Sequence, residues 1–78
     1  MRVKKPTLVI TFATTTQAMA VEKYCMDNGL PGRIIPVPRE ITAGCGLGWK
    51  AAPEDQAVLT EALKDSGLGW EEMHIIEI

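Results

Sequence analysis

Residues 7–17 read TLVITFATTTQ, and this stretch decides how the rest of the chain is interpreted. Residues 7–13 carry no charge and are mostly β-branched, aromatic or aliphatic, which is typical of a buried strand. Thr14 and Gln17 have the spacing of a capping box, in which side chains at a helix start bond its free backbone N–H groups. The stretch therefore predicts a strand that leads directly into a helix.

The same alternation of strand and helix signals recurs along the chain. Both predicted helices end at a glycine followed by a leucine, at residues 28–30 and 66–68, since glycine readily takes the left-handed conformation that ends a helix. Pro53 suits the first turn of the second helix. The predicted elements are, in chain order, a strand at 7–13, a helix at 14–28, strands at 33–37 and 47–51, a helix at 53–66 and a strand at 73–78.

Two strand–helix–strand units predict an α+β fold of the ferredoxin-like βαββαβ type. We expect a four-stranded antiparallel sheet of order 4-1-3-2 with both helices on one face. Pro36 and Pro38 lie two residues apart, so their missing N–H groups point the same way, which a sheet tolerates only at its edge. The second strand is an edge strand in this order. We expect residues 1–78 to form a single domain.

Composition and charge exclude several classes of protein. The chain is 46% hydrophobic and 23% charged, which is ordinary for a globular protein, and no apolar run approaches the roughly 20 residues of a membrane helix. A net charge of −2 argues against nucleic-acid binding by general phosphate attraction. Residues 1–50 carry seven Lys or Arg against three Asp or Glu, and residues 51–78 carry one against seven. An anionic ligand should therefore bind the first two thirds.

The cysteine count bounds the redox and metal chemistry. Two cysteines, Cys25 and Cys45, cannot form a disulfide scaffold, and with His74 as the single histidine they do not complete a four-ligand zinc site. We therefore predict no metal and no cofactor. The apolar run at 7–13 is short for a signal peptide, which favours a reduced, cytoplasmic protein.

The stretch most informative about function is residues 36–50, which read PVPREITAGCGLGWK. It joins the second and third strands with more residues than a hairpin needs, and an over-long loop in a small domain suggests function. Cys45 lies between Gly44 and Gly46, which leave backbone N–H groups uncovered and can form a small anion-holding concavity.

The predicted topology places this loop beside the start of the first helix. The first and second strands run parallel in this fold, so their carboxyl ends lie at the same end of the sheet. Cys45 should then lie near the helix N-terminus, near Arg39 of its own loop, and near the hydroxyls of Thr14, Thr15 and Thr16. A helix N-terminus and a cation both lower the pKa of a thiol. We therefore hypothesise that Cys45 is a nucleophilic thiolate.

Plainer interpretations of the same residues stay open. A cysteine in a glycine-rich turn can simply be small, Arg39 can be a solvated charge, and Trp49 can be either packed or part of a partner-facing surface. Cys25 lies on the apolar face of the first helix and is expected to be structural. With His74 on the last strand and no Cys-x-x-Cys motif, a lone thiol is best suited to attack on an activated sulfur.

Two segments, TFATTTQAMAVEK at 11–23 and RIIPVPREITAGCGL at 33–47, resemble a family of small bacterial selenium/sulfur (Se/S) carrier-like proteins. The resemblance implies a bacterial cytosolic domain whose Cys45 holds sulfur or selenium as a persulfide or perselenide. The chain lacks the Cys-Pro-x-Pro signature of other small sulfur-relay proteins. The positions matched around Cys45 are Pro36, Pro38, Arg39, Gly44 and Gly46.

The leading hypothesis is a carrier, rather than a turnover enzyme, that passes sulfur or selenium on Cys45 from a donor protein to an acceptor protein. Pro36 and Pro38 would shape the loop, and Trp49 would face the partners. The alternative is a small-molecule-sensing or regulatory module that binds its ligand in a homodimer formed through the edge strand at 73–78. A third possibility is an assembly adaptor, for which the thiol has no role.

Overall fold

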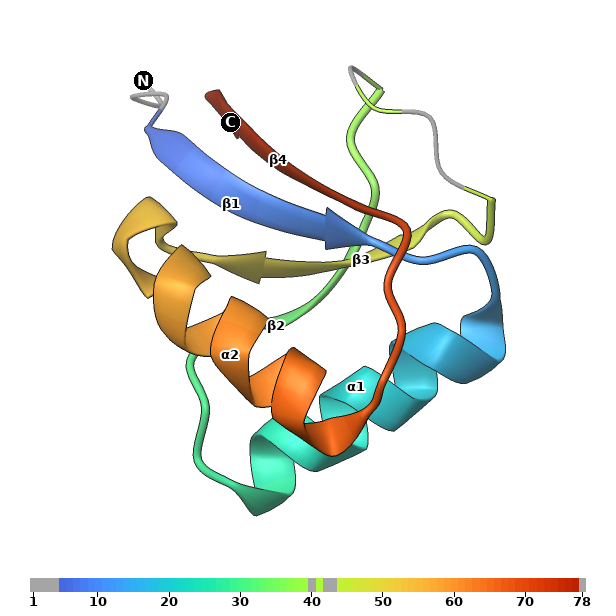
Figure 1. The fold of residues 1–78 in the computed structure, drawn as a ribbon. Helices are drawn as coiled ribbons and strands as arrows, with labels where there is room; N and C mark the ends of the chain where they lie inside the picture. Colours follow the sequence, from blue (N-terminus) through green and yellow to red (C-terminus); the bar gives the residue numbers. More distant parts are fainter. Residues whose placement is uncertain (1–4, 40, 42–43, 78) are drawn as a thin grey trace.

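A computed structural model describes residues 5–39, 41 and 44–77, and its element order is the predicted one (Figure 1). The third strand has the predicted bounds, whereas the first ends two residues early, at Thr11. Ile78, predicted in the last strand, lies outside the described residues. The elements are β1 (Pro6–Thr11), α1 (Thr15–Asp27), β2 (Arg33–Pro36), β3 (Leu47–Ala51), the 3-10 helix η1 (Pro53–Asp55), α2 (Gln56–Ser66) and β4 (Glu72–Glu77).

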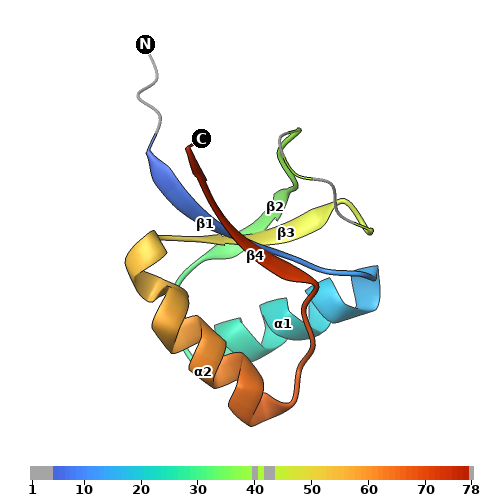
Figure 2. The same cartoon turned by 45° about the horizontal axis from the view of Figure 1, so that its top comes forward.

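The four strands form one antiparallel sheet in the order β2-β3-β1-β4. Read from the other edge, this is the predicted order 4-1-3-2. Both helices cover the same face of the sheet (Figure 1), and β1 and β4 run side by side (Figure 2). The α+β class, the antiparallel sheet and its two helices are therefore confirmed, while the ferredoxin-like designation stays a prediction. None of the helices in the described ranges is long and apolar enough to cross a membrane.

The two prolines after residue 35 lie at the sheet edge, as their spacing predicted. β2 pairs with β3 alone. The N–H of Val37 points toward β3 and donates to the carbonyl of Gly46 at 2.9 Å. Because N–H directions alternate along an extended chain, the nitrogens of Pro36 and Pro38 face away from β3. Neither proline therefore removes a hydrogen bond from the ladder.

The hydrophobic core lies between the sheet and the helices. β1 is its centre, because Leu8 and Ile10 are fully buried on the face that the helices cover. α1 contributes Cys25 to this core, and α2 contributes Leu59 and Leu63. Cys25 has no exposed surface, and burial raises the pKa of its thiol, so its expected structural role agrees with its position.

Both ends of α1 are capped by local bonds that its sequence anticipates. Thr14 Oγ1 accepts from the N–H of Gln17 at 3.2 Å, and Gln17 Oε1 accepts from the N–H of Ala13 at 2.9 Å. In the usual capping box, the side chain at the Gln17 position accepts from the N–H of the cap residue itself. Here it accepts from the N–H of Ala13, the residue before the Thr14 cap. At the other end, the N–H of Leu30 donates to the carbonyl of Cys25 at 2.8 Å, past a left-handed glycine.

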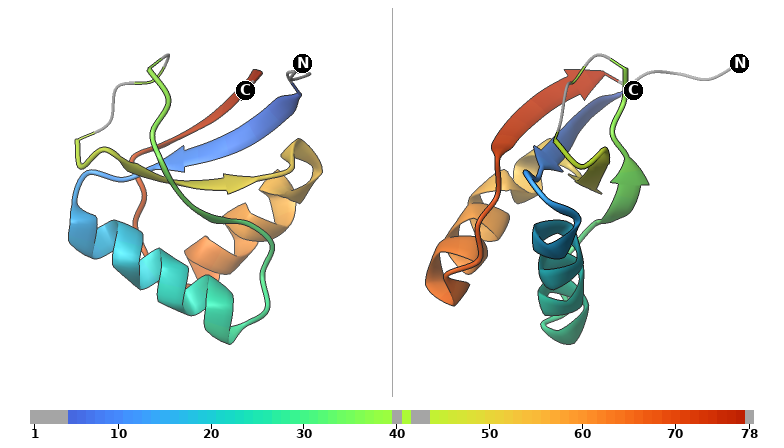
Figure 3. Two further views of the ribbon diagram at one scale, coloured as in Figure 1. Left: turned by 180° about the vertical axis from the view of Figure 1, so that it is seen from behind. Right: turned by 90° about the vertical axis from the view of Figure 1, so that its right-hand side faces the viewer.

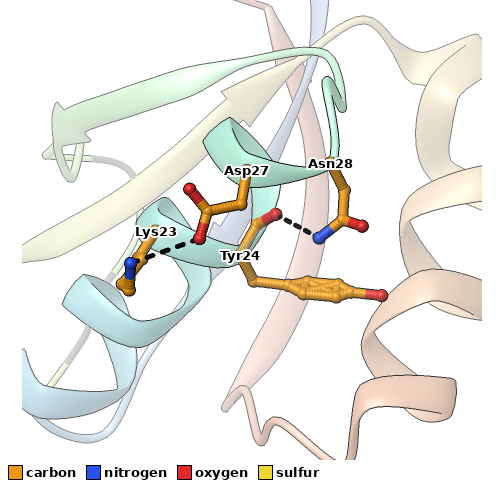
Figure 4. A network of polar contacts seen from close by, with 4 residues as sticks. All are labelled: Lys23, Tyr24, Asp27 and Asn28. Carbon is orange, nitrogen blue, oxygen red and sulfur yellow. Dashed lines mark hydrogen bonds and ion pairs between the residues drawn. The ribbon is translucent and has the colours of Figure 1, made fainter.

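The last turn of α1 carries two further polar contacts (Figure 4). Asn28 Nδ2 donates to the carbonyl of Tyr24 at 2.8 Å, and Lys23 Nζ lies 3.2 Å from Asp27 Oδ2. The ion pair is largely exposed, so it contributes little to stability. The Tyr24 carbonyl also accepts from the backbone N–H of Asn28 at 3.1 Å, so Asn28 holds the end of the helix with both its backbone and its side chain.

We expect Thr14→Ala to lower the free energy of unfolding by about 1 kcal/mol, because it removes the side-chain oxygen that caps α1. The matched control is Thr16→Ala, since the Thr16 side chain is exposed in the first turn of the same helix. Equilibrium urea unfolding followed by circular dichroism measures both. Equal losses in the two variants would contradict the assignment of the cap to Thr14.

Candidate functional site

The described residues of the loop that joins β2 to β3 lie on the face of the sheet that the helices leave open (Figure 3). Val9 of β1 faces away from the helices, yet it is fully buried. A Cβ at Gly48 would lie 3.2 Å from Val9 Cγ1 and 3.2 Å from Val37 Cγ2, so these two side chains meet over Gly48. Ile41 of the same loop is also buried. The loop is therefore anchored by apolar contacts at its base.

Gly44 of this loop packs against the residue that precedes the cap of α1. A Cβ at Gly44 would lie only 2.8 Å from the carbonyl oxygen of Ala13, so the Gly44 backbone contacts the turn between β1 and α1. β1 and β2 are both antiparallel to β3 and hence parallel to each other. Their carboxyl ends lie together for this reason, and Cys45 follows Gly44 at that end of the sheet.

Cys45 is half-buried, its side chain packs against the hydrophobic core, and a backbone donor lies beside its sulfur. The N–H of Leu47 lies 3.4 Å from Cys45 Sγ, and the thiol can donate to the carbonyl of Leu47 at 3.6 Å. Gly46, between them, has a φ of +76°, which lets the chain fold back on the sulfur.

The remaining predicted site residues differ in how they are placed. Thr14 Oγ1 accepts a bond from the first turn of α1, and Thr15 and Thr16 are exposed in that turn. Arg39 is exposed in the loop after β2. The Gly44 backbone contacts the carbonyl of Ala13, the residue before the Thr14 cap of α1.

Trp49 requires a correction. Its side chain is 2% exposed and belongs to the core, and its Nε1 donates to the carbonyl of Pro31 at 3.0 Å. Trp49 lies opposite Ile10 of β1 and Ile34 of β2, on the face that the helices cover. Its ring therefore cannot form the partner-facing surface that the sequence analysis expected.

His74 lies away from the thiol, on the edge strand β4, as expected for a structural or surface residue. Its Nε2 is 3.5 Å from Glu72 Oε1 on the same strand, too far for a strong hydrogen bond. β1 separates β4 from β3, which begins two residues after Cys45. In the part of the chain that the structure describes, no group of three or more His, Cys, Asp or Glu residues could hold a metal ion.

Two contributors to the site were not identified from the sequence, namely the N–H of Leu47 and the carbonyl of Ala13. Both are backbone groups, which every residue carries, so no side-chain pattern marks them. The neighbouring glycines are their only signal, because glycine at 44 permits the close approach of Ala13.

Comparison with known proteins gives one match. The model of a family described as "Putative Se/S carrier protein-like" matches residues 7–75. No curated protein and no solved structure matches the chain. The matched region includes all of β1 except Pro6, the whole of α1 and the whole Cys45 loop.

Proposed function

Because the chain belongs to the Se/S carrier protein-like family, we propose that it carries sulfur or selenium as a persulfide or perselenide on Cys45. The observation that carries this proposal is the position of the Cys45 sulfur. Cys45 is half-buried at the end of the sheet where α1 begins, and the Leu47 N–H lies 3.4 Å from its sulfur. A fully buried thiol without a hydrogen-bond donor would instead be typical of a cysteine that only packs in the core.

The transfer itself is an exchange between two sulfur atoms. The Cys45 thiolate attacks the outer sulfur of a persulfide on a donor protein, forming a new S–S bond while the donor's S–S bond breaks. The donor leaves as a thiolate, and the outer atom, with any proton it carries, stays on Cys45. No external oxidant or reductant is consumed, and the acceptor removes the atom by the same exchange. Selenium is transferred by the same exchange, with an S–Se bond in place of each S–S bond.

The surroundings of Cys45 favour an anion in three ways in this proposal. The Leu47 N–H and the glycine-flanked backbone at Gly44 and Gly46 supply donors at short range. The N-terminus of α1, with the hydroxyls of residues 14–16, supplies a positive dipole end and further donors. Arg39 supplies a full charge that can approach an anion bound to the exposed loop. Pro36 and Pro38 stiffen the strand end from which the loop departs.

Donor and acceptor proteins of sulfur or selenium transfer dock on the β2–β3 loop in this proposal, and the protein works in the bacterial cytoplasm without a cofactor. The order of elements and of strands supports the ferredoxin-like designation. The rival proposal, a regulatory module that dimerises through β4, is favoured by Ile75, which is 51% exposed on that edge strand. The two proposals differ in whether Cys45 is needed.

The test is intact-mass spectrometry after incubation with a cysteine desulfurase and cysteine. We expect a mass increase of about 32 Da per sulfur on the wild type, or about 80 Da per selenium with the corresponding selenium donor system. Cys45→Ser should abolish the increase, and Cys25→Ala, the matched control, should retain it. Adducts of equal yield on Cys45→Ser, or none on the folded wild type, would contradict the carrier proposal.

A further inference from the structure

A cavity at the end of the sheet remote from Cys45 is lined by three cationic residues. It has a volume of about 510 Å³ and lies where β1 and β2 begin and β3 ends. Lys5 precedes β1, Arg33 is the first residue of β2, and Lys50 lies near the end of β3. No Asp or Glu among the described residues lines it. The other lining residues are Pro6, Thr7, Gly32, Ala51 and Ala52.

Two of these cations face each other across neighbouring strands. Arg33 is the direct cross-strand partner of Lys50, and directly opposed like charges destabilise a sheet. Lys50 also lies opposite Val9, which places it on the face that the helices leave open. The ion pairs found among residues 5–39, 41 and 44–77 involve neither Arg33 nor Lys50. A bound anion would convert this repulsion into attraction.

One wall of the cavity is bare backbone held in a fixed shape. Gly32 has a φ of +114°, and the space of its missing Cβ is occupied by the Trp49 indole and the Lys50 carbonyl. The bond from Trp49 Nε1 to the carbonyl of Pro31 holds this turn against the sheet. The wall that this turn forms is thus pre-formed, and the volume of the cavity falls in the range of small-molecule sites.

We propose that this cavity binds a small, multiply charged oxyanion of the phosphate type. A guanidinium and two ammonium groups from three separate segments are the groups that recognise such an anion. The concave shape favours a compact anion over an extended acidic peptide. The cavity lies at the start of β1 and Cys45 lies at its end. Because a strand rises roughly 3.3 Å per residue, the two ends of β1 are about 17 Å apart. The site is therefore distinct from the thiol.

The test is calorimetric titration of the full chain with pyrophosphate and, separately, with inorganic phosphate, at low and at high salt. We expect salt-sensitive binding that Arg33→Gln and Lys50→Gln each weaken about tenfold. The matched control is Lys64→Gln, since Lys64 is an exposed cation in the last turn of α2 and does not line the cavity. Its affinity should equal that of the wild type.

Stability measurements keep the test independent of folding defects. Removing one of two opposed cations should leave the urea midpoint unchanged or raise it, and pyrophosphate should raise the melting temperature of the wild type more than that of either cavity variant. Absence of binding to the wild type, or wild-type affinity in both Arg33→Gln and Lys50→Gln, would overturn the proposal. So would binding of a polyglutamate peptide in preference to pyrophosphate. Cys45→Ser should bind like the wild type, which separates this outcome from the carrier proposal.

Discussion

Gly32→Ala should lower the free energy of unfolding by about 3 kcal/mol or more, the largest loss that we expect from adding one methyl group to this chain. Its φ of +114° is strained for any residue with a side chain. The added Cβ would also overlap the Trp49 indole and the Lys50 carbonyl, and a packed core resists such overlap. Because the overlapped indole nitrogen donates to Pro31, that bond should be broken as well.

Gly29→Ala is the matched control, in the same connection between α1 and β2. Gly29 also has a positive φ, of +64°, but nothing lies within 4 Å of its missing Cβ. Its loss should therefore be only about 1 kcal/mol, the cost of the left-handed backbone alone. Urea unfolding measures both variants, and the indole N–H resonance of Trp49 reports the bond to Pro31. Losses of equal size would show that the close packing around Gly32 is not as described.

Iodoacetamide should modify Cys45 of the folded protein at least about a thousandfold faster than Cys25. Cys45 is partly exposed, whereas Cys25 has no exposed surface and reacts only when the core opens. Opening that requires global unfolding costs at least about 5 kcal/mol in an ordinary domain, which suppresses the rate by a factor of about a thousand or more. Mass spectrometry of peptides after timed quenching measures both rates.

The single-cysteine variants serve as controls for this measurement. Cys25→Ala should react at the wild-type rate and Cys45→Ser very slowly, while concentrated urea should make both cysteines of the wild type equally reactive. If iodoacetamide modified Cys45 as slowly as Cys25, this result would contradict the proposed role of the Cys45 thiol.

The buried thiol also makes stability depend on pH. Burial raises the pKa of Cys25 above its ordinary value of 9.0, so the folded protein holds this proton where the unfolded chain releases it. The contribution of this thiol to the free energy of unfolding is therefore complete at pH values below 9.0. It is lost as the pH rises from 9.0 toward the pKa of Cys25 in the folded protein.

Much of the fold could be predicted because its signals are local. A capping box, two glycine-leucine helix ends and a charge-free run at 7–13 each act within a few residues, and each was found near its predicted position. The sheet order needed a longer inference. It rested on the expected ferredoxin-like arrangement of two strand–helix–strand units, and Pro36 and Pro38 supported it because a sheet tolerates missing N–H groups only at its edge.

The candidate sites were predicted less completely, because they depend on contacts between distant segments. Side chains alternate between the two faces of a strand, but the sequence of residues 47–51 does not show which face Trp49 occupies. Its pairing with Ile10 places the ring on the face that the helices cover, where it is buried. The charge imbalance of residues 1–50 indicated where any anionic ligand would bind, but the register of β2 and β3 was needed to show that Arg33 and Lys50 lie opposite each other.

By itself, then, the sequence determined the elements, their order and the glycine-flanked thiol, since backbone preference and capping are properties of neighbouring residues. The tertiary structure alone decided that the Gly44 backbone contacts Ala13 and that three cations line one cavity. Those outcomes depend on strand register, and a shift of one residue would move each side chain to the opposite face.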